Sequence, residues 1–178
     1  MIELRTLCVS HMFPNKEKPN FGVFVKERIK SIAEKVETTI VAPVPHFPLI
    51  HLMEKYSHTK NIRDNEEIDG LHVYHPRYLL IPRLFKYLDG LLYYISLNRF
   101  FVDILQKGNH DILDFHWVYP DAYAGLRWAR LYKKKIVVTI RGNESICYSE
   151  KSLRKRILID TLKSVDHIIA VSNDMKNK

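Results

Sequence analysis

The sequence lacks any apolar run that could cross a membrane. Its 178 residues include no uninterrupted stretch near the roughly 18 to 20 apolar residues that a transmembrane helix needs. Glu3 and Arg5 stand where a secretory signal peptide would have its apolar core, so no export signal is recognisable. We therefore expect a cytoplasmic protein, with peripheral attachment to the inner face of the membrane as the alternative.

Cysteine is scarce, and the common nucleotide-binding motifs are missing. The two cysteines, Cys8 and Cys147, lie far apart without the spacing of metal ligands, which argues against a zinc site and a disulfide framework. No G-x-G-x-x-G fingerprint and no P-loop lysine motif is present, so dinucleotide and nucleoside triphosphate binding of the usual kinds is unsupported. We expect neither a metal nor a cofactor.

Several common catalytic and binding patterns are also absent. The chain has no Ser-His-Asp order, no paired catalytic carboxylates and no recognised nucleic-acid-binding motif. Its formal net charge of +8 nevertheless favours an anionic partner, such as an acidic membrane face or a phosphorylated substrate. Nucleic acid is not expected, because the charge comes without a motif that would bind it.

What the sequence does contain is the alternation of an α/β protein. It is 46% hydrophobic and 27% charged, which is the composition of a folded domain, and its length fits one domain. Short aliphatic and β-branched segments alternate with segments of helical periodicity, which predicts a doubly wound, Rossmann-like parallel sheet with helices on both faces. The predicted strands are 4–10, 37–42, 71–77, 112–116, 136–140 and 167–171, and the predicted helices are 25–33, 83–106, a helix from 120, and 149–164.

The segment from Phe47 to Asp69 shows no clean periodicity. Prolines at positions 43, 45 and 48 end the second predicted strand, because proline lacks the N–H that a strand ladder needs. A loop this long in a compact domain is usually functional, mobile or the site of a short helix.

A histidine stands where the fourth predicted strand gives way to a helix. Residues 112–115 form a short buried strand in this interpretation, and Pro120 suits a first helical turn, so His116 and Asp121 fall in the crevice between them. Open α/β sheets bind ligands at the carboxyl ends of their strands. A histidine there can offer a neutral imidazole to a polar ligand, and we interpret His116 as a functional residue rather than a core residue.

Two other turns belong to the same predicted edge. Gly22 lies immediately before the first helix, where backbone N–H groups favour an anion and glycine allows a ligand to approach the chain closely. Arg141, Gly142, Asn143 and Glu144 follow the fifth strand, and the arginine can hold a phosphate or carboxylate in a fork. An ordinary turn at Gly22 and a surface arginine are the alternatives.

Four segments carry a family pattern, in order and at consistent distances. They are Phe13-Pro-Asn with Asn20-Phe-Gly-Val-Phe-Val-Lys-Glu-Arg28, then Asp111-Ile-Leu-Asp-Phe-His-Trp-Val-Tyr-Pro-Asp121, Val137-Val-Thr-Ile-Arg-Gly-Asn-Glu144 and Asp166-His-Ile-Ile-Ala-Val-Ser172. Together they closely resemble the amino-terminal domain of glycosyltransferase family four, over essentially the whole chain.

The resemblance implies a GT-B enzyme with two Rossmann-like domains that face each other across a cleft. Such an enzyme moves a sugar from a nucleotide-sugar donor to a glycan, lipid or small-molecule acceptor, with retention at the anomeric carbon and without a metal. Residues 1–178 then correspond to one Rossmann-like domain, the acceptor side. Because the donor-binding carboxyl-terminal domain is absent from this sequence, the resemblance implies that the segment is inactive alone.

The resemblance also assigns roles to the candidate residues. His116 matches the cleft histidine that contacts the donor sugar near the reacting carbon, and Gly22 matches the loop glycine near the donor diphosphate. Residues 141–144 match the polar turn that lines the acceptor side. Asp114 departs from the pattern, because many relatives have a second histidine at that position.

A non-catalytic binding module for an anionic lipid or glycan is the second hypothesis, since the chain is basic. Under either hypothesis the sheet should be parallel at its centre, so that His116 and Arg141 approach each other at one edge. We also expect the edge lined by Gly22, His116, Arg141 and Asn143 to be open and exposed.

Overall fold

A mostly parallel sheet lies at the centre of the computed structural model, which describes residues 4–48, 50, 53–81, 86–142 and 152–176. Its strands are β1 (Arg5–Val9), β2 (Glu37–Val41), β4 (Asn65–Ile68), β5 (Leu71–Tyr74), β7 (Ile112–Phe115), β8 (Lys135–Ile140) and β9 (His167–Ala170). They follow the order β4-β5-β2-β1-β7-β8-β9, and of these strands β4 is the one that pairs antiparallel. The chain therefore winds outward from β1 in one direction and then in the other, as in a doubly wound fold.

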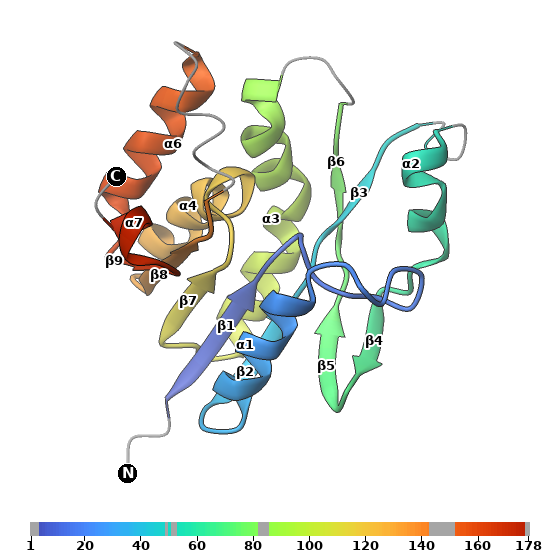
Figure 1. Cartoon of the computed structure of the whole chain (residues 1–178), viewed down its shortest axis with the longest axis horizontal. Helices are drawn as coiled ribbons and strands as arrows, with labels where there is room; N and C mark the ends of the chain where they lie inside the picture. Colours follow the sequence, from blue (N-terminus) through green and yellow to red (C-terminus); the bar gives the residue numbers. More distant parts are fainter. Residues whose placement is uncertain (1–3, 49, 51–52, 82–85, 143–151, 177–178) are drawn as a thin grey trace.

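Helices cover both faces of this sheet (Figure 1). Helix α1 (Val23–Ala33) packs on one face, and α3 (Asp89–Lys107) and α4 (Tyr123–Leu131) pack on the other, where α6 (Leu153–Ser164) lies against α4. The predicted α/β fold class, with a Rossmann-like sheet, is confirmed. Within the described residues no helix combines the length and the apolar character that crossing a bilayer would take.

Each face has its own apolar core. Under α1, Val25 and Ile29 meet Ile40 and Val73 of the sheet, all buried. On the other face the ring of Trp128 stacks on Phe101 at 3.8 Å between centroids and 8° between planes, and its Nε1–H donates to Asn98. Apolar surface buried in this way supplies most of the favourable free energy of folding.

Five of the six predicted strands agree with the structure to within one residue at each end. The prediction for 71–77 was wrong at its carboxyl end, because β5 stops at Tyr74 and a separate strand, β6 (Arg77–Leu79), begins after Pro76. Strand β6 pairs in parallel with β3 (Val44–His46) to form a small sheet that continues β2 and β5 past their prolines. These three-residue strands leave no detectable alternation in the sequence.

The segment without periodicity contains a short helix, α2 (Glu54–Ser57), a 3-10 turn (His58–Asn61) and the edge strand β4. The long predicted helix 83–106 begins only at Asp89 as α3, after a 3-10 turn at Lys86–Leu88, and its first predicted residues lie outside the described ranges. The predicted helix from 120 is α4, preceded by a π turn at Val118–Ala122, and the basic helix is α6. A last short helix, α7 (Asn173–Lys176), follows β9.

Candidate functional site

A pocket of about 550 Å³ opens at the carboxyl ends of β1, β2, β5 and β7. Its volume is within the range of small-molecule sites, about 300 to 1,000 Å³. The walls come from the loops after these strands, from α2 and the β3–β6 pair on one side, and from the starts of α3 and α6 on the other. Figure 1 shows α2 and the β3–β6 pair to the right of α3 and α6. The pocket therefore lies at the carboxyl edge of the sheet, but Gly22, His116, Arg141 and Gly142 are not among its lining residues.

Two residues that follow different strands join at the floor of this pocket. The His11 backbone N–H donates to Asp121 Oδ2 at 3.0 Å, and the His11 ring Nδ1 lies 2.9 Å from Asp121 Oδ1. Asp121 is fully buried, whereas His11 lines the pocket and packs edge-on against Trp117. The carboxylate thus fixes both the loop after β1 and the orientation of an imidazole at the pocket.

An aromatic and charged wall forms where α3 and α6 begin. The Tyr119 hydroxyl accepts from Gly90 N–H at 2.8 Å and donates to Lys86 O at 3.0 Å, so Tyr119 offers its ring rather than its hydroxyl to a ligand. Burial raises the pKa of Tyr119 to about 12. Gly90 is required for this contact, since a Cβ there would lie 2.7 Å from the Tyr119 ring.

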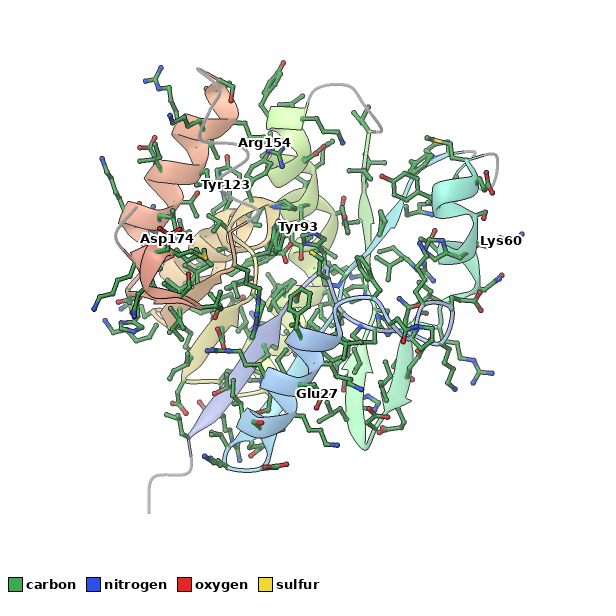
Figure 2. The ribbon with its side chains drawn as sticks, viewed as in Figure 1. Glu27, Lys60, Tyr93, Tyr123, Arg154 and Asp174 are labelled. Atoms are coloured by element: carbon green, nitrogen blue, oxygen red, sulfur yellow. The ribbon has the colours of Figure 1, made fainter. Side chains whose placement is uncertain are left out.

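The same wall carries three charged side chains. Lys86 Nζ lies 3.2 Å from Asp89 Oδ2, and the Arg154 guanidinium lies 5.5 Å from the centroid of the Tyr119 ring. Burial raises the pKa of Asp89, while Lys86 and Arg154 oppose that change. Figure 2 shows Arg154 on the side of α6 that faces α3. The wall therefore has two cations against one carboxyl group.

His116 and Arg141 meet as predicted, but outside this pocket, next to α1. Arg141 Nη2 donates to His116 Nδ1 at 3.3 Å. Because guanidinium groups only donate, Nδ1 must be the acceptor, and the ring hydrogen of His116 then sits on Nε2, 3.4 Å from Asp114 Oδ2. The contact with Arg141 therefore selects the tautomer of His116 that carries its hydrogen on Nε2.

The expectation of an exposed edge was wrong for two of its residues. Gly22 and His116 are buried, and Arg141 is half-buried. The physical reason is the start of α1, where the Phe24 ring lies 4.9 Å from the Arg141 guanidinium and Arg141 in turn contacts His116. Asn143 and Glu144 lie outside the described residues, as does Cys147, while Gly142 is described and adopts a φ of 99°.

Cys8, Asp114 and His116 bring three metal-ligating atoms within 4.8 Å of one another, all buried on the face under α1. This donor set does not suit a cation. The hydrogen on His116 Nε2 blocks the nitrogen that faces the cluster, Arg28 adds a positive charge nearby, and burial and Asp114 raise the pKa of the Cys8 thiol. The chemistry of the cluster is that of a polar network rather than a metal site.

Polar atoms without hydrogen bonds gather in this network. Within the described residues, Asp114 Oδ1, His116 Nε2 and Thr139 Oγ1 are buried and have no hydrogen-bond partner. Buried polar atoms are nearly always satisfied by protein, water or a ligand, so these three mark a part of the structure where polar groups await partners. One of them belongs to His116, the residue that the sequence identifies as the catalytic candidate, and Asp114 lies next to it.

Gly22 has a backbone reason to be glycine. Its φ is 71°, in the left-handed region, and a Cβ built on it would lie 2.4 Å from the Met12 carbonyl oxygen. The residue begins α1, where its carbonyl accepts from the Val25 and Lys26 N–H groups. The structure thus uses Gly22 to fold the first loop against the helix start.

Replacing Gly22 by alanine should therefore lower the free energy of unfolding by more than about 2 kcal/mol, because left-handed strain and a clash add. Gly70→Ala is the control: its φ is 80°, but nothing lies within 4 Å of the new Cβ, so it should cost only about 1 kcal/mol. Urea denaturation measures both. Equal losses in the two variants would show that the loop gives way without strain.

Sequence reasoning missed most of the pocket lining. His11 follows β1 as His116 follows β7, and that parallel position was the available signal. Arg154, Lys86 and His75 carry no local motif, and they converge only through the packing of α6, α3 and β5.

Comparison with known proteins gives a family and a fold. Residues 57–178 match the family model described as Glycosyltransferase Family 4. The sequence matches none of the curated proteins with which it was compared. Among solved structures, sucrose-phosphate synthase from Thermosynechococcus elongatus superposes with a TM-score of 0.60 at 10% identity, over 97% of this chain and 78% of that chain.

Two further structures show the same architecture. A protein assigned as a UDP-N-acetylglucosamine 2-epimerase from Listeria monocytogenes gives a TM-score of 0.58 at 12% identity, over 99% of this chain and 42% of that one. UGT89C1 from Arabidopsis thaliana in complex with UDP gives 0.52 at 11% identity, over 98% and 46%. At these identities the likeness concerns the fold, and the chain spans less than half of these two proteins.

Proposed function

Because the chain belongs to glycosyltransferase family 4, we propose that it is the acceptor-side domain of a retaining glycosyltransferase. The enzyme moves a sugar from a nucleotide-sugar donor to a glycan, lipid or small-molecule acceptor. In this step the bond between the anomeric carbon and the diphosphate oxygen breaks, a bond to the acceptor oxygen forms, and the proton of the acceptor hydroxyl passes to the leaving nucleoside diphosphate.

The observation that carries the proposal is the pocket at the carboxyl edge of the sheet. Its aromatic rings, among them Trp117, Tyr119 and Phe13, offer apolar surfaces, while His11 and the cations of the α3–α6 wall offer polar contacts. A mostly apolar pocket with a few placed polar groups is typical of small-molecule sites. This supports an acceptor site made by this domain.

The donor side of the proposal rests on the network under α1. We assign His116 to the donor sugar, Gly22 to the vicinity of the diphosphate, and Arg141, Gly142, Asn143 and Glu144 to the acceptor-side turn. The unpartnered atoms of Asp114, His116 and Thr139 support a polar ligand in this place.

The domain should be inactive by itself. A transfer enzyme gains much of its rate from orienting both substrates and from stabilising the leaving group. The proposal gives the second of these tasks, and most of the donor binding, to a carboxyl-terminal domain.

A transfer assay tests the proposal on a protein that joins this domain to a donor-binding domain. UDP-sugars and GDP-sugars serve as donors, and glucose, glucose 6-phosphate and phosphatidylinositol vesicles serve as acceptors. We expect acceptor-dependent release of nucleoside diphosphate, a product whose anomeric proton coupling shows the donor configuration, and no release by residues 1–178 alone. A product with inverted anomeric configuration would refute retention. Turnover by the single domain would refute the assignment of donor binding and leaving-group stabilisation to a second domain.

The net charge of +8 favours one other function, a non-catalytic module that binds an anionic lipid or glycan. Acceptor binding by the two-domain protein without release of nucleotide from any donor would support that alternative.

A further inference from the structure

His75, a buried residue of the pocket, has one ring nitrogen that can accept a hydrogen bond from a ligand. His75 follows β5, lines the pocket and is 1% exposed. Its ring Nδ1 lies 2.9 Å from the Ala42 carbonyl oxygen, and because a carbonyl only accepts, Nδ1 carries the hydrogen. Burial holds the pKa of His75 below its usual value, which keeps the ring neutral. Its Nε2 is therefore a lone-pair acceptor.

This Nε2 atom lacks a donor. Within the described residues it has no hydrogen-bond partner, and Glu66 Oε2, 4.0 Å away, is itself an acceptor that already receives the Lys16 N–H. Two acceptors that face each other in a buried place need a donor between them. Because Glu66 Oε2 already has the Lys16 N–H, Nε2 is the atom that still lacks a donor, and the single hydrogen of a ligand hydroxyl in the pocket would supply it.

The wall formed by the starts of α3 and α6 offers positive charge. Lys86 Nζ forms an ion pair with Asp89 Oδ2 at 3.2 Å and donates a hydrogen bond to the Ile81 carbonyl oxygen at 3.3 Å. Arg154 has no ion pair within the described residues, and its Nε is buried without a hydrogen-bond partner. Lys86 and Arg154 together outweigh the single carboxyl group of Asp89, so this wall carries net positive charge. The paired N–H donors of the Arg154 guanidinium can bind an anion.

Aromatic rings also line the pocket. Tyr78, Trp117 and Tyr119 line the same pocket as His75 and Arg154, and the hydrogen of the Tyr119 hydroxyl is already donated to Lys86 O. The rings therefore present carbon surfaces, which pack against the C–H faces of a sugar or other polyol ring. The pocket therefore combines an acceptor for hydroxyls, apolar ring surfaces and positive charge.

We propose, on the premise of the proposed function, that the acceptor substrate is a phosphorylated polyol. One of its hydroxyl groups donates to His75 Nε2, its ring packs against the aromatic side chains, and its phosphate binds Arg154 beside Lys86. The phosphate belongs either to a free sugar phosphate or to the head group of an inositol lipid, and the two sources share this recognition.

Binding to residues 1–178, measured by isothermal titration calorimetry at about 0.15 M salt to screen weak surface charge effects, tests the phosphate end. Glucose 6-phosphate should bind about tenfold more tightly than glucose or inorganic phosphate, because a charged hydrogen bond adds about that factor. Arg154→Gln should remove this tenfold gain and leave glucose binding unchanged. Arg156→Gln, on the exposed side of the same helix, removes the same charge and should change neither.

Two substitutions of His75 test the hydroxyl end. In His75→Asn the shorter amide keeps a donor near Ala42 but has no acceptor at the Nε2 position, whereas the longer amide in His75→Gln places an acceptor there. We expect His75→Asn to weaken glucose 6-phosphate and glucose alike, by about fivefold, and His75→Gln to stay within about twofold of the wild type. Thermal midpoints confirm that both variants are folded before binding is compared.

Vesicles of phosphatidylinositol in phosphatidylcholine separate the two sources of phosphate. Binding to these vesicles that is lost in Arg154→Gln, without binding of glucose 6-phosphate, assigns the phosphate to a lipid. The proposal is overturned if neither probe binds, if Arg154→Gln and Arg156→Gln act alike, or if His75→Asn binds as the wild type does. Transfer to glucose in the two-domain assay would then still uphold the glycosyltransferase. Phosphate-specific binding without transfer would refute the glycosyltransferase instead.

Discussion

Replacing His116 by alanine should lower kcat for sugar transfer on the order of 100-fold in the two-domain protein, because preorganised polar groups at a reacting centre contribute that much. The side chain lies between Arg141, which donates to Nδ1, and Asp114, which faces Nε2. That arrangement fixes the tautomer before any substrate binds. We expect the thermal midpoint to fall by only a few degrees.

His110→Ala provides the matched control for this prediction. His110 is 2% exposed and contacts Thr39 Oγ1 at 2.9 Å, but it precedes β7, at the opposite edge of the sheet. It should lower the thermal midpoint as much as His116→Ala does and leave kcat unchanged. Unchanged turnover in His116→Ala, with a large loss of midpoint, would return His116 to a structural role.

The second large effect is expected at Asp121. Asp121→Ala should lower the free energy of unfolding by about 3 kcal/mol, because it leaves the His11 backbone N–H and ring without their buried acceptor. Asp121→Asn retains one acceptor oxygen and should lose about half as much. Urea denaturation gives both values.

Asp103→Ala is the control for charge. Asp103 pairs with Lys107 at 2.6 Å on the exposed side of α3, and exposed pairs one helical turn apart contribute only about 0.3 to 0.5 kcal/mol. A loss at Asp121 no greater than the loss at Asp103 would mean that the loop after β1 is held by other contacts.

The sequence was sufficient to predict the central sheet, because each parallel strand is a short apolar run bounded by turns or helices. It also predicted the meeting of His116 and Arg141, since parallel strands bring their carboxyl ends to one edge. The predicted exposure failed because Phe24, from α1, lies over Arg141. A contact between segments so distant along the chain has no periodicity to reveal it.

The pocket illustrates the same limit. The contact with the Ala42 carbonyl, directly after β2, determines which ring nitrogen of His75 carries the hydrogen. Arg154 reaches the pocket from a helix much later in the chain. Neither residue lies in a motif. The short strands β3 and β6 were missed because Pro45 interrupts the first and each has three residues.

The β3–β6 pair has a consequence for how such domains diverge. Its residues Val44, Pro45 and Tyr78 line the pocket, yet its two strands pair with each other and not with the seven strands of the central sheet. Changes in their side chains alter the shape of the pocket without disturbing the register of that sheet. We therefore expect substitutions in the β3–β6 pair to change which substrates fit the pocket while the central sheet and the site of His116 stay in place.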